Sequence, residues 1–274
     1  MTEIWKAILF GIVEGITEWL PVSSTGHMIL LDEFVTLDVS DAFWDLFLVV
    51  IQLGAILAVI AVYFRDLIPL KRDHGIRPDR AKCSMWLKII VASIPAGVVG
   101  VLWDDVFTEL FYNFRTVAVM LILVGIVFIV IENKGRGKEP SVRSIEEISY
   151  GQAFLIGIFQ MIAAVFTGTS RSGYTIIGSL LLGITRTTAA QFTFFLAIPA
   201  MVGGSAIKLL KYDGAFQANE LLLLAVGMVV AFLVSIAAIR FLMSYIRRHD
   251  FKAFGWYRIV LGAVVLVYYT MKVS

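Results

Sequence analysis

The stretch GIVEGITEWLPVSSTGH, residues 11–27, has a counterpart in GIFQMIAAVFTGTSRSG, residues 157–173. In both, an apolar run of helical length breaks at small and hydroxyl residues, and a shorter apolar run follows. The two stretches align at a constant offset of 146 residues without a gap, and the alignment makes three polar pairs: Glu14 with Gln160, Ser24 with Ser170, and Thr25 with Arg171. This pattern predicts two copies of a broken helical hairpin.

The composition is that of a membrane protein. The 274 residues are 59% hydrophobic and 16% charged, with a mean hydropathy of +0.87, and ordinary soluble domains are far less apolar. Apolar runs long enough to cross about 30 Å of hydrocarbon recur along the chain. The short alternating segments of a membrane barrel are absent from the sequence. We therefore expect a single all-α membrane domain comprising residues 1–274.

Two of the expected helices are too short to cross a bilayer. Residues 26–37 and 173–184 each have about 12 residues, which reach only halfway at roughly 1.5 Å per residue. Because each follows one of the breaks, residues 4–37 and 148–184 are interpreted as re-entrant hairpins. Six full transmembrane helices are predicted in addition, at residues 43–64, 85–103, 115–132, 188–210, 220–241 and 253–271.

This arrangement predicts an inverted-topology repeat. A re-entrant hairpin enters and leaves on one side, so each half adds three full spans and the second half begins on the opposite face. The repeats are residues 1–135 and 148–274, and such pairs place a site at the midplane, between their broken elements.

Loop charges predict the orientation. One face carries fourteen Lys and Arg residues, in the segments 65–84, 132–147 and 240–252, whereas the other face carries five. By the positive-inside rule the first face is cytoplasmic. Both termini and a loop at residues 104–114 are then expected on the periplasmic side.

Two carboxylates precede the first break. Glu14 and Glu18 are four residues apart, so they share a helix face and can act on the same ion or proton. A carboxylate at the bilayer centre costs about 2.5–3.5 kcal/mol and needs a partner. The alternative is a shallow helix whose two glutamates touch water at its end.

The first tip, residues 21–27, offers three hydroxyls and an imidazole: Ser23, Ser24, Thr25 and His27. Free N–H groups at a helix start form an anion site that suits phosphate. Serine and threonine are also ordinary N-caps, and the two roles are compatible. His27 is a candidate base, acid or nucleophile, with a structural histidine as the alternative.

The second tip, residues 168–173, combines hydroxyls and flexible backbone with a guanidinium. Its candidate binding residues are Thr169, Ser170, Ser172 and Gly173, which surround Arg171. Arginine stays charged when desolvated and its planar fork matches a phosphate. The alternative is that Arg171 only neutralises Glu14 or Glu18, which would still bring the tips into contact.

Four ordered motifs together resemble the undecaprenyl-diphosphate phosphatase family, also called bacitracin-resistance phosphatases. The motifs are Glu14-x-x-x-Glu18, PVSSTGH at 21–27, VIQLGAILAV at 50–59 and GTSRSG at 168–173. The resemblance covers nearly the whole chain. It implies a bacterial inner-membrane enzyme that removes one phosphate from undecaprenyl diphosphate and regenerates the lipid carrier for cell-wall synthesis. One position departs from the family pattern: Thr167 stands where proline is usual.

The resemblance also implies the roles of individual residues. It assigns metal-dependent catalysis to Glu14 and Glu18, with magnesium or calcium as the divalent cation, and phosphate handling to Ser24, His27, Ser170 and Arg171. The site would open to the periplasmic side. Hard carboxylate oxygens suit these two cations better than zinc.

Several alternatives stay open on sequence grounds. Inverted repeats with broken helices are also the architecture of transporters, so a phosphate-bearing lipid or another anion could be carried instead of cleaved. The nucleophile is Ser24, His27 or a metal-bound water. A homodimer is one assembly to consider, and no nucleic-acid partner is expected. The prenyl tail of the substrate would lie along apolar helix faces such as that of Phe192, Phe194 and Phe195, unless these are ordinary lipid-facing or core aromatics.

Overall fold

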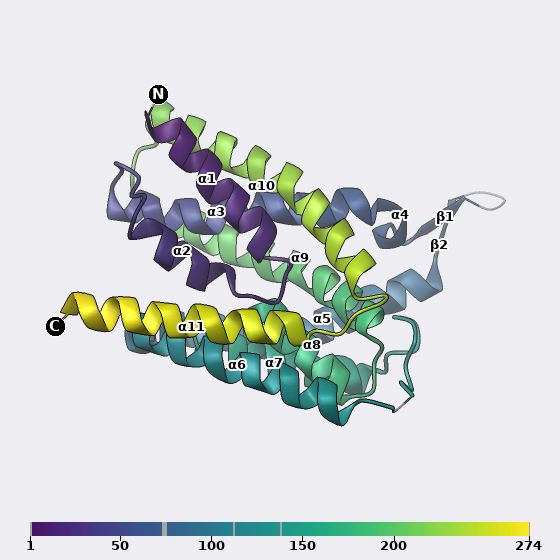
Figure 1. Cartoon of the computed structure of the whole chain (residues 1–274). Coiled ribbons are helices and arrows are strands. Elements are labelled where there is room, and N and C mark those ends of the chain that lie inside the picture. The colour runs from purple at the N-terminus through teal and green to yellow at the C-terminus, as the bar shows by residue number, and fades with distance from the viewer. Residues whose placement is uncertain (1, 73–75, 112, 138, 274) are drawn as a thin grey trace.

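The computed structural model describes residues 2–72, 76–111, 113–137 and 139–273, and it is almost entirely helical (Figure 1). The first half contains α1 (Thr2–Thr17), α2 (Ser24–Asp32), α3 (Asp41–Val62), α4 (Phe64–Leu67), α5 (Arg80–Phe111) and α6 (Phe114–Lys134). The second half contains α7 (Tyr150–Val165), α8 (Arg171–Leu181), α9 (Arg186–Lys211), α10 (Ala218–Tyr245) and α11 (Lys252–Val273). Two short strands, β1 (Leu70–Arg72) and β2 (Ile76–Pro78), form an antiparallel hairpin between α4 and α5.

Six helices in the described part of the chain are long and apolar enough to cross a membrane, which confirms the predicted number of full spans. They are α3, α5, α6, α9, α10 and α11. The predicted short helices are also present, because α2 has 9 residues and α8 has 11. The chain is therefore a multi-pass helical membrane protein.

The helices of one half pack mainly on helices of the other half. Helix α1 lies along α10, α7 lies along α5, and α6 lies along α11. The duplicated glycines permit the first two contacts, because a Cβ at Gly11 would stand 2.7 Å from the Gly227 carbonyl oxygen of α10. A Cβ at Gly157 would stand 2.3 Å from the Ala92 carbonyl oxygen of α5. The two halves are thus held together by close helix contacts.

Each short hairpin is closed at its open end by polar contacts. In the first, Lys6 donates to the Thr36 carbonyl oxygen at 2.7 Å, and Glu3 accepts from the Asp38 N–H at 2.9 Å. In the second, the Gln152 side chain donates to the Leu182 carbonyl oxygen at 3.4 Å. In each hairpin, the start of the long helix therefore lies beside the end of the short helix.

The two ends of the bundle differ in what they hold. Both termini lie at one end and the β1–β2 hairpin lies at the other (Figure 1). At the hairpin end, the buried Glu132 forms an ion pair with Arg186 and accepts the Phe251 N–H at 3.0 Å. Lys88 donates there to the Glu146 carbonyl oxygen at 2.8 Å. These contacts involve the segments 132–147 and 240–252, which the loop charges assign to one face.

One sequence prediction is wrong, and one alternative that the sequence left open is settled. The loop predicted at 104–114 is mostly helix, because α5 continues to Phe111 through an internal proline, Pro95; a run of charges ends the apolar span but does not end the helix. Phe192, Phe194 and Phe195 are fully buried core residues rather than a lipid-facing path for a prenyl tail. Phe194 packs on Trp19 and Phe195 on Tyr63, with ring centroids 5.3 and 5.2 Å apart.

Candidate functional site

The two tips share an unusual backbone. Ser23 and Ser170 have φ of 74° and 71°, and among the described residues they are the non-glycine residues with positive φ. Each is the N-cap of the short helix that follows, and its hydroxyl accepts the N–H of Gly26 at 3.4 Å or of Gly173 at 3.2 Å. Such conformations cost about 1–3 kcal/mol and persist where the surroundings impose them. The capping role considered for the hydroxyls is thus confirmed at Ser23 and Ser170.

These caps correct the alignment of the two stretches. Ser23 and Ser170 hold the same structural position, so the offset at the tips is 147 residues rather than 146. Ser24 then corresponds to Arg171, and the predicted pairs of Ser24 with Ser170 and Thr25 with Arg171 are wrong. The glycines Gly11 and Gly157 still keep the offset of 146. One additional residue therefore lies between this glycine and the cap in the second copy.

Glu18 joins the two tips. It follows the last residue of α1, and its N–H bonds to the Glu14 carbonyl oxygen at 3.0 Å, which continues the helical pattern by one turn. Its Oε1 accepts Arg171 Nη2 at 2.6 Å, and its Oε2 accepts the Ser24 hydroxyl at 2.7 Å. One carboxylate thus holds a guanidinium from the second tip and a hydroxyl from the first.

The second tip adds a chain of hydroxyls to this contact. Ser172 donates to the Glu18 carbonyl oxygen at 3.2 Å, and its oxygen lies 3.1 Å from the Ser170 hydroxyl. Arg171 keeps one buried nitrogen, Nη1, without a hydrogen-bond partner in the part of the chain that is described. A donor of this kind is available to a ligand oxygen.

Glu14 lies behind this cluster. It is 1% exposed and Glu18 is 8% exposed, so neither carboxylate reaches water at the end of a shallow helix. The charged groups that act on Glu14 are Glu18 and Arg171. Its Oε1 has no hydrogen-bond partner among the described residues, and the same is true of Oε1 in its counterpart Gln160. A buried carboxylate oxygen without a donor is a place for a cation or a proton.

The carboxylates of Glu14 and Glu18 fit a divalent cation. Among the residues that the structure describes, no group of three or more His, Cys, Asp or Glu side chains is arranged to hold a metal ion. Magnesium, however, is commonly bound by one or two carboxylates together with substrate phosphates. Glu14 and Glu18 supply two carboxylates, one with a free buried oxygen.

His27 makes its hydrogen bonds away from the carboxylates. Its Nδ1 lies 2.7 Å from the Ser23 carbonyl oxygen, and its Nε2 lies 2.6 Å from the Tyr257 hydroxyl, whose ring is stacked on the imidazole. A carbonyl oxygen can only accept, so in the neutral ring Nδ1 carries the proton and Nε2 accepts from Tyr257. His27 therefore presents a basic nitrogen toward α11.

The other predicted residues have local contacts. The Thr169 hydroxyl donates to the Phe166 carbonyl oxygen at 2.7 Å and so closes the end of α7. Thr25 lies partly buried in the first turn of α2. The Gly173 N–H is used by the cap of α8.

Two residues of α11 belong to this neighbourhood although the sequence analysis gave them no role. Tyr257 contacts His27, and Arg258 donates to carbonyl oxygens of both tips. The signal available in the sequence was an arginine within the apolar helix predicted at 253–271. A charge at that depth marks a functional or strongly paired position.

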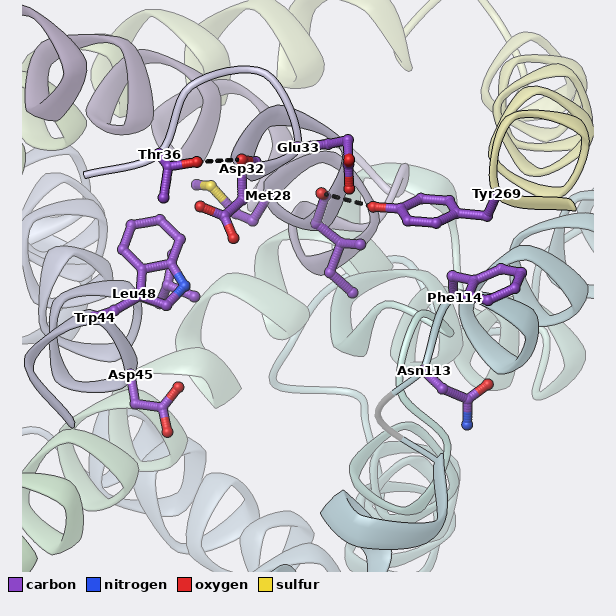
Figure 2. Close-up of a pocket in the computed structure, with 11 residues that line it drawn as sticks. Met28, Asp32, Glu33, Thr36, Trp44, Asp45, Leu48, Asn113, Phe114 and Tyr269 are labelled. Carbon is purple, nitrogen blue, oxygen red and sulfur yellow. Dashed lines mark hydrogen bonds between the residues drawn. The ribbon is translucent and has the colours of Figure 1, made fainter. Parts of the chain in front are cut away.

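A cavity of about 450 Å³ lies at the outer part of α2 (Figure 2). Trp44 and Asp45 line one side, and Asn113, Phe114 and Tyr269 line the other (Figure 2). Met28, the residue after His27, reaches it from α2, but none of the predicted site residues lines it. The candidate site is thus the buried contact of the tips, and the cavity is lined by other residues.

The fold and this cluster define a class of protein: multi-pass helical membrane proteins in which two broken hairpins bring carboxylates, hydroxyls and a guanidinium together below the surface. Comparison with known families narrows the class. The chain belongs to the family described as bacitracin resistance protein BacA, whose model matches residues 7–264. This confirms the resemblance that the four motifs carry.

Curated relatives match the chain over nearly its whole length. An undecaprenyl-diphosphatase of Desulfitobacterium hafniense is 62% identical over 272 residues, which cover 99% of this chain and 98% of the relative. Undecaprenyl-diphosphatase 1 of Clostridium acetobutylicum is 60% identical over 267 residues, 97% of each chain. An undecaprenyl-diphosphatase of Acetivibrio thermocellus is 52% identical over 269 residues, 98% of each chain.

Proposed function

We propose that this protein hydrolyses undecaprenyl diphosphate to undecaprenyl phosphate and inorganic phosphate, and so recycles the lipid carrier for cell-wall synthesis. The names of the relatives, which match nearly the whole chain, support this substrate. The observation that carries the chemistry is Glu18, which accepts the Ser24 hydroxyl at 2.7 Å and Arg171 at 2.6 Å. A base, a hydroxyl and a phosphate-binding fork thus meet at one point.

In this proposal Ser24 is the nucleophile. Glu18 takes the hydroxyl proton while the Ser24 oxygen forms a bond to the terminal phosphorus, and the bond from that phosphorus to the bridging oxygen breaks. Undecaprenyl phosphate leaves with the electron pair of that bond. Water then attacks the phosphoserine, so phosphate is released and Ser24 regains its proton.

Arg171 and His27 take different parts in the reaction. Arg171 has a free buried nitrogen beside its bond to Glu18, so it can bind a phosphate oxygen while it keeps the second tip in place. Fixed donors of this kind stabilise charge that develops in the transition state. His27 holds a proton acceptor at Nε2 and assists proton transfer once Tyr257 yields its hydrogen bond.

We further propose that Glu14 and Glu18 bind a divalent cation, magnesium or calcium. The free buried Oε1 of Glu14 and the oxygen-rich surroundings support this assignment. When bound, such a cation neutralises charge on the phosphate oxygens.

The topology is proposed on three grounds. The paired left-handed caps, the exchanged packing of α1 on α10 and α7 on α5, and the shared open ends of the hairpins support inverted repeats at 1–135 and 148–274 with re-entrant hairpins. The fourteen basic residues counted in the segments 65–84, 132–147 and 240–252 support a cytoplasmic location for the β1–β2 end. The site would then open to the periplasmic side of the bacterial inner membrane.

The test is phosphate release by the purified full chain in detergent, with undecaprenyl diphosphate as substrate and no gradient. We expect turnover that depends on magnesium or calcium and is lost in Glu18→Gln. A transporter of a phosphate-bearing lipid needs two compartments and would leave the substrate intact. Failure of the well-folded wild-type protein to release phosphate would contradict the proposal.

A further inference from the structure

The inference concerns Arg258, a fully buried arginine in the second turn of α11 with 0% exposure. Its Nη1 donates to the Pro21 carbonyl oxygen at 3.2 Å. Its Nη2 donates to the carbonyl oxygens of Gly168 at 3.1 Å and Thr169 at 2.8 Å. One guanidinium therefore holds the backbone of the first tip with one nitrogen and that of the second tip with the other.

The carbonyl groups that it binds lie at corresponding places. Pro21 precedes the cap Ser23 by two residues, and Gly168 precedes the cap Ser170 by two residues. Backbone that leaves a helix inside a membrane protein must find donors for its carbonyl groups, because no lipid atom can supply them. Arg258 supplies these donors to both links at once, from a helix that belongs to neither hairpin.

The contacts of Arg258 are with backbone rather than with the carboxylates of the site. The hydrogen bonds described for its guanidinium all go to backbone oxygens, whereas Glu18 is held by Arg171. The planar fork of arginine fixes the angle between its two terminal nitrogens. The spacing between the tips is therefore set by a rigid group.

We propose that Arg258 is a positioning residue that fixes the separation of the first and second tips, so that Ser24 and Glu18 of one side and Arg171 of the other act on the same phosphorus. This inference rests on the proposed phosphatase function. The reaction needs groups from both tips on one substrate, and a misplacement of 1 Å far from the chemistry can cost about 10²-fold in rate.

The first test compares Arg258→Lys with Arg186→Lys. Lysine keeps the charge but is a point donor that cannot span both tips. Arg186 is the matched control, because it pairs with Glu132 at the far end of the bundle. For Arg258→Lys we expect kcat to fall by about 10²-fold, with a smaller change in KM. For Arg186→Lys we expect a loss of thermal stability with a kcat near that of the wild type.

The second test does not depend on activity. Amide hydrogen exchange, measured by mass spectrometry on the full chain, should become faster in Arg258→Lys in peptides of both tips, residues 18–27 and 166–174. Arg186→Lys should change neither. If the wild-type protein released no phosphate, the proposed function would fail, and this measurement would still decide the role of Arg258.

A third variant guards against a folding failure of Arg258→Lys. A Cβ at Gly173 would stand 3.4 Å from Arg258 Nη1 and 3.3 Å from the Ser170 Cβ, so Gly173→Ala displaces the guanidinium only slightly. It should lower kcat less than Arg258→Lys and raise exchange in both tips. The inference is overturned if kcat follows stability alike in Arg258→Lys and Arg186→Lys, or if exchange changes in one tip only or in neither.

Discussion

The two tips have the same backbone and opposite chemistry. Both have a serine cap with positive φ before a short helix, and both hairpins approach a long helix of the other half through a glycine. The first carries Glu14 and Ser24 where the second carries Gln160 and Arg171. The difference teaches that the groups that shape the break are alike in the two stretches, whereas the anionic and cationic side chains are divided between them. The two tips meet where Arg171 donates to Glu18.

The largest effect is expected when the Glu18 carboxylate is removed. Glu18→Gln should lower kcat by about 10²–10⁴-fold, because a neutral amide cannot take the Ser24 proton or balance Arg171. Phosphate release under saturating cation measures this. The matched control is Glu139→Gln, an 89% exposed carboxylate paired with Arg143, whose loss should be silent. Near wild-type turnover in Glu18→Gln across a magnesium and calcium titration would show that the Glu18 carboxylate is not needed.

The cationic side of the comparison is tested by Arg171→Lys. The charge stays but the fork is lost, so kcat/KM should fall by about 10²–10³-fold, as for loss of a transition-state donor. Steady-state kinetics with undecaprenyl diphosphate gives the value, and Arg143→Lys at an exposed ion pair is the control. If Arg171→Lys behaves as the wild type does, charge alone suffices and the second tip has no special geometry.

The shared packing of the hairpins is tested by alanine at the two glycines. Gly157→Ala should destabilise more than Gly11→Ala, because its Cβ would lie 2.3 Å rather than 2.7 Å from a carbonyl oxygen. Overpacking of this kind costs about 1–3 kcal/mol. Thermal unfolding in detergent measures the order. Gly97→Ala in α5 is the control, since nothing lies within 4 Å of its Cβ; equal stability of all three variants would argue against the close contacts.

The smallest effect is expected at the caps. Ser23→Gly and Ser170→Gly each lose a capping hydroxyl, which costs a few tenths of a kcal/mol, but each also relieves a positive φ. Their unfolding temperatures should stay close to that of the wild type. Ser23→Ala and Ser170→Ala keep the strain and lose the cap, so they should be less stable by about 0.5–2 kcal/mol. The reverse order would mean that the backbone at the tips is not strained.

Much of this architecture was predictable because membrane spans are written in long apolar runs. The six spans, the two short helices and the contact of Arg171 with a glutamate all follow from hydropathy, helix length and the cost of buried charge. The register of the tips was not predictable in this way. A single additional residue between the glycine and the cap leaves hydropathy unchanged, and only the positions of the caps reveal it.

Contacts between distant helices were also beyond the sequence pattern. Arg258 was visible as a charge in an apolar helix, but its partners are backbone carbonyl groups, which carry no residue-specific signal. His27 was placed with the carboxylates because it is close to them in sequence, whereas its ring lies against Tyr257, 230 residues away. Apolar patterning also cannot separate a lipid-facing phenylalanine from a core one, as at Phe194.

The packing of α1 on α10 has a consequence for the order of synthesis. About 200 residues separate the end of α1 from the start of α10, so at roughly 5–20 residues per second the first hairpin leaves the ribosome some 10–40 s before its partner exists. Arg171, which pairs with Glu18, follows it by 153 residues and is also made late in that interval. The packing of α1 on α10 and its contact with the second tip therefore form only late in translation.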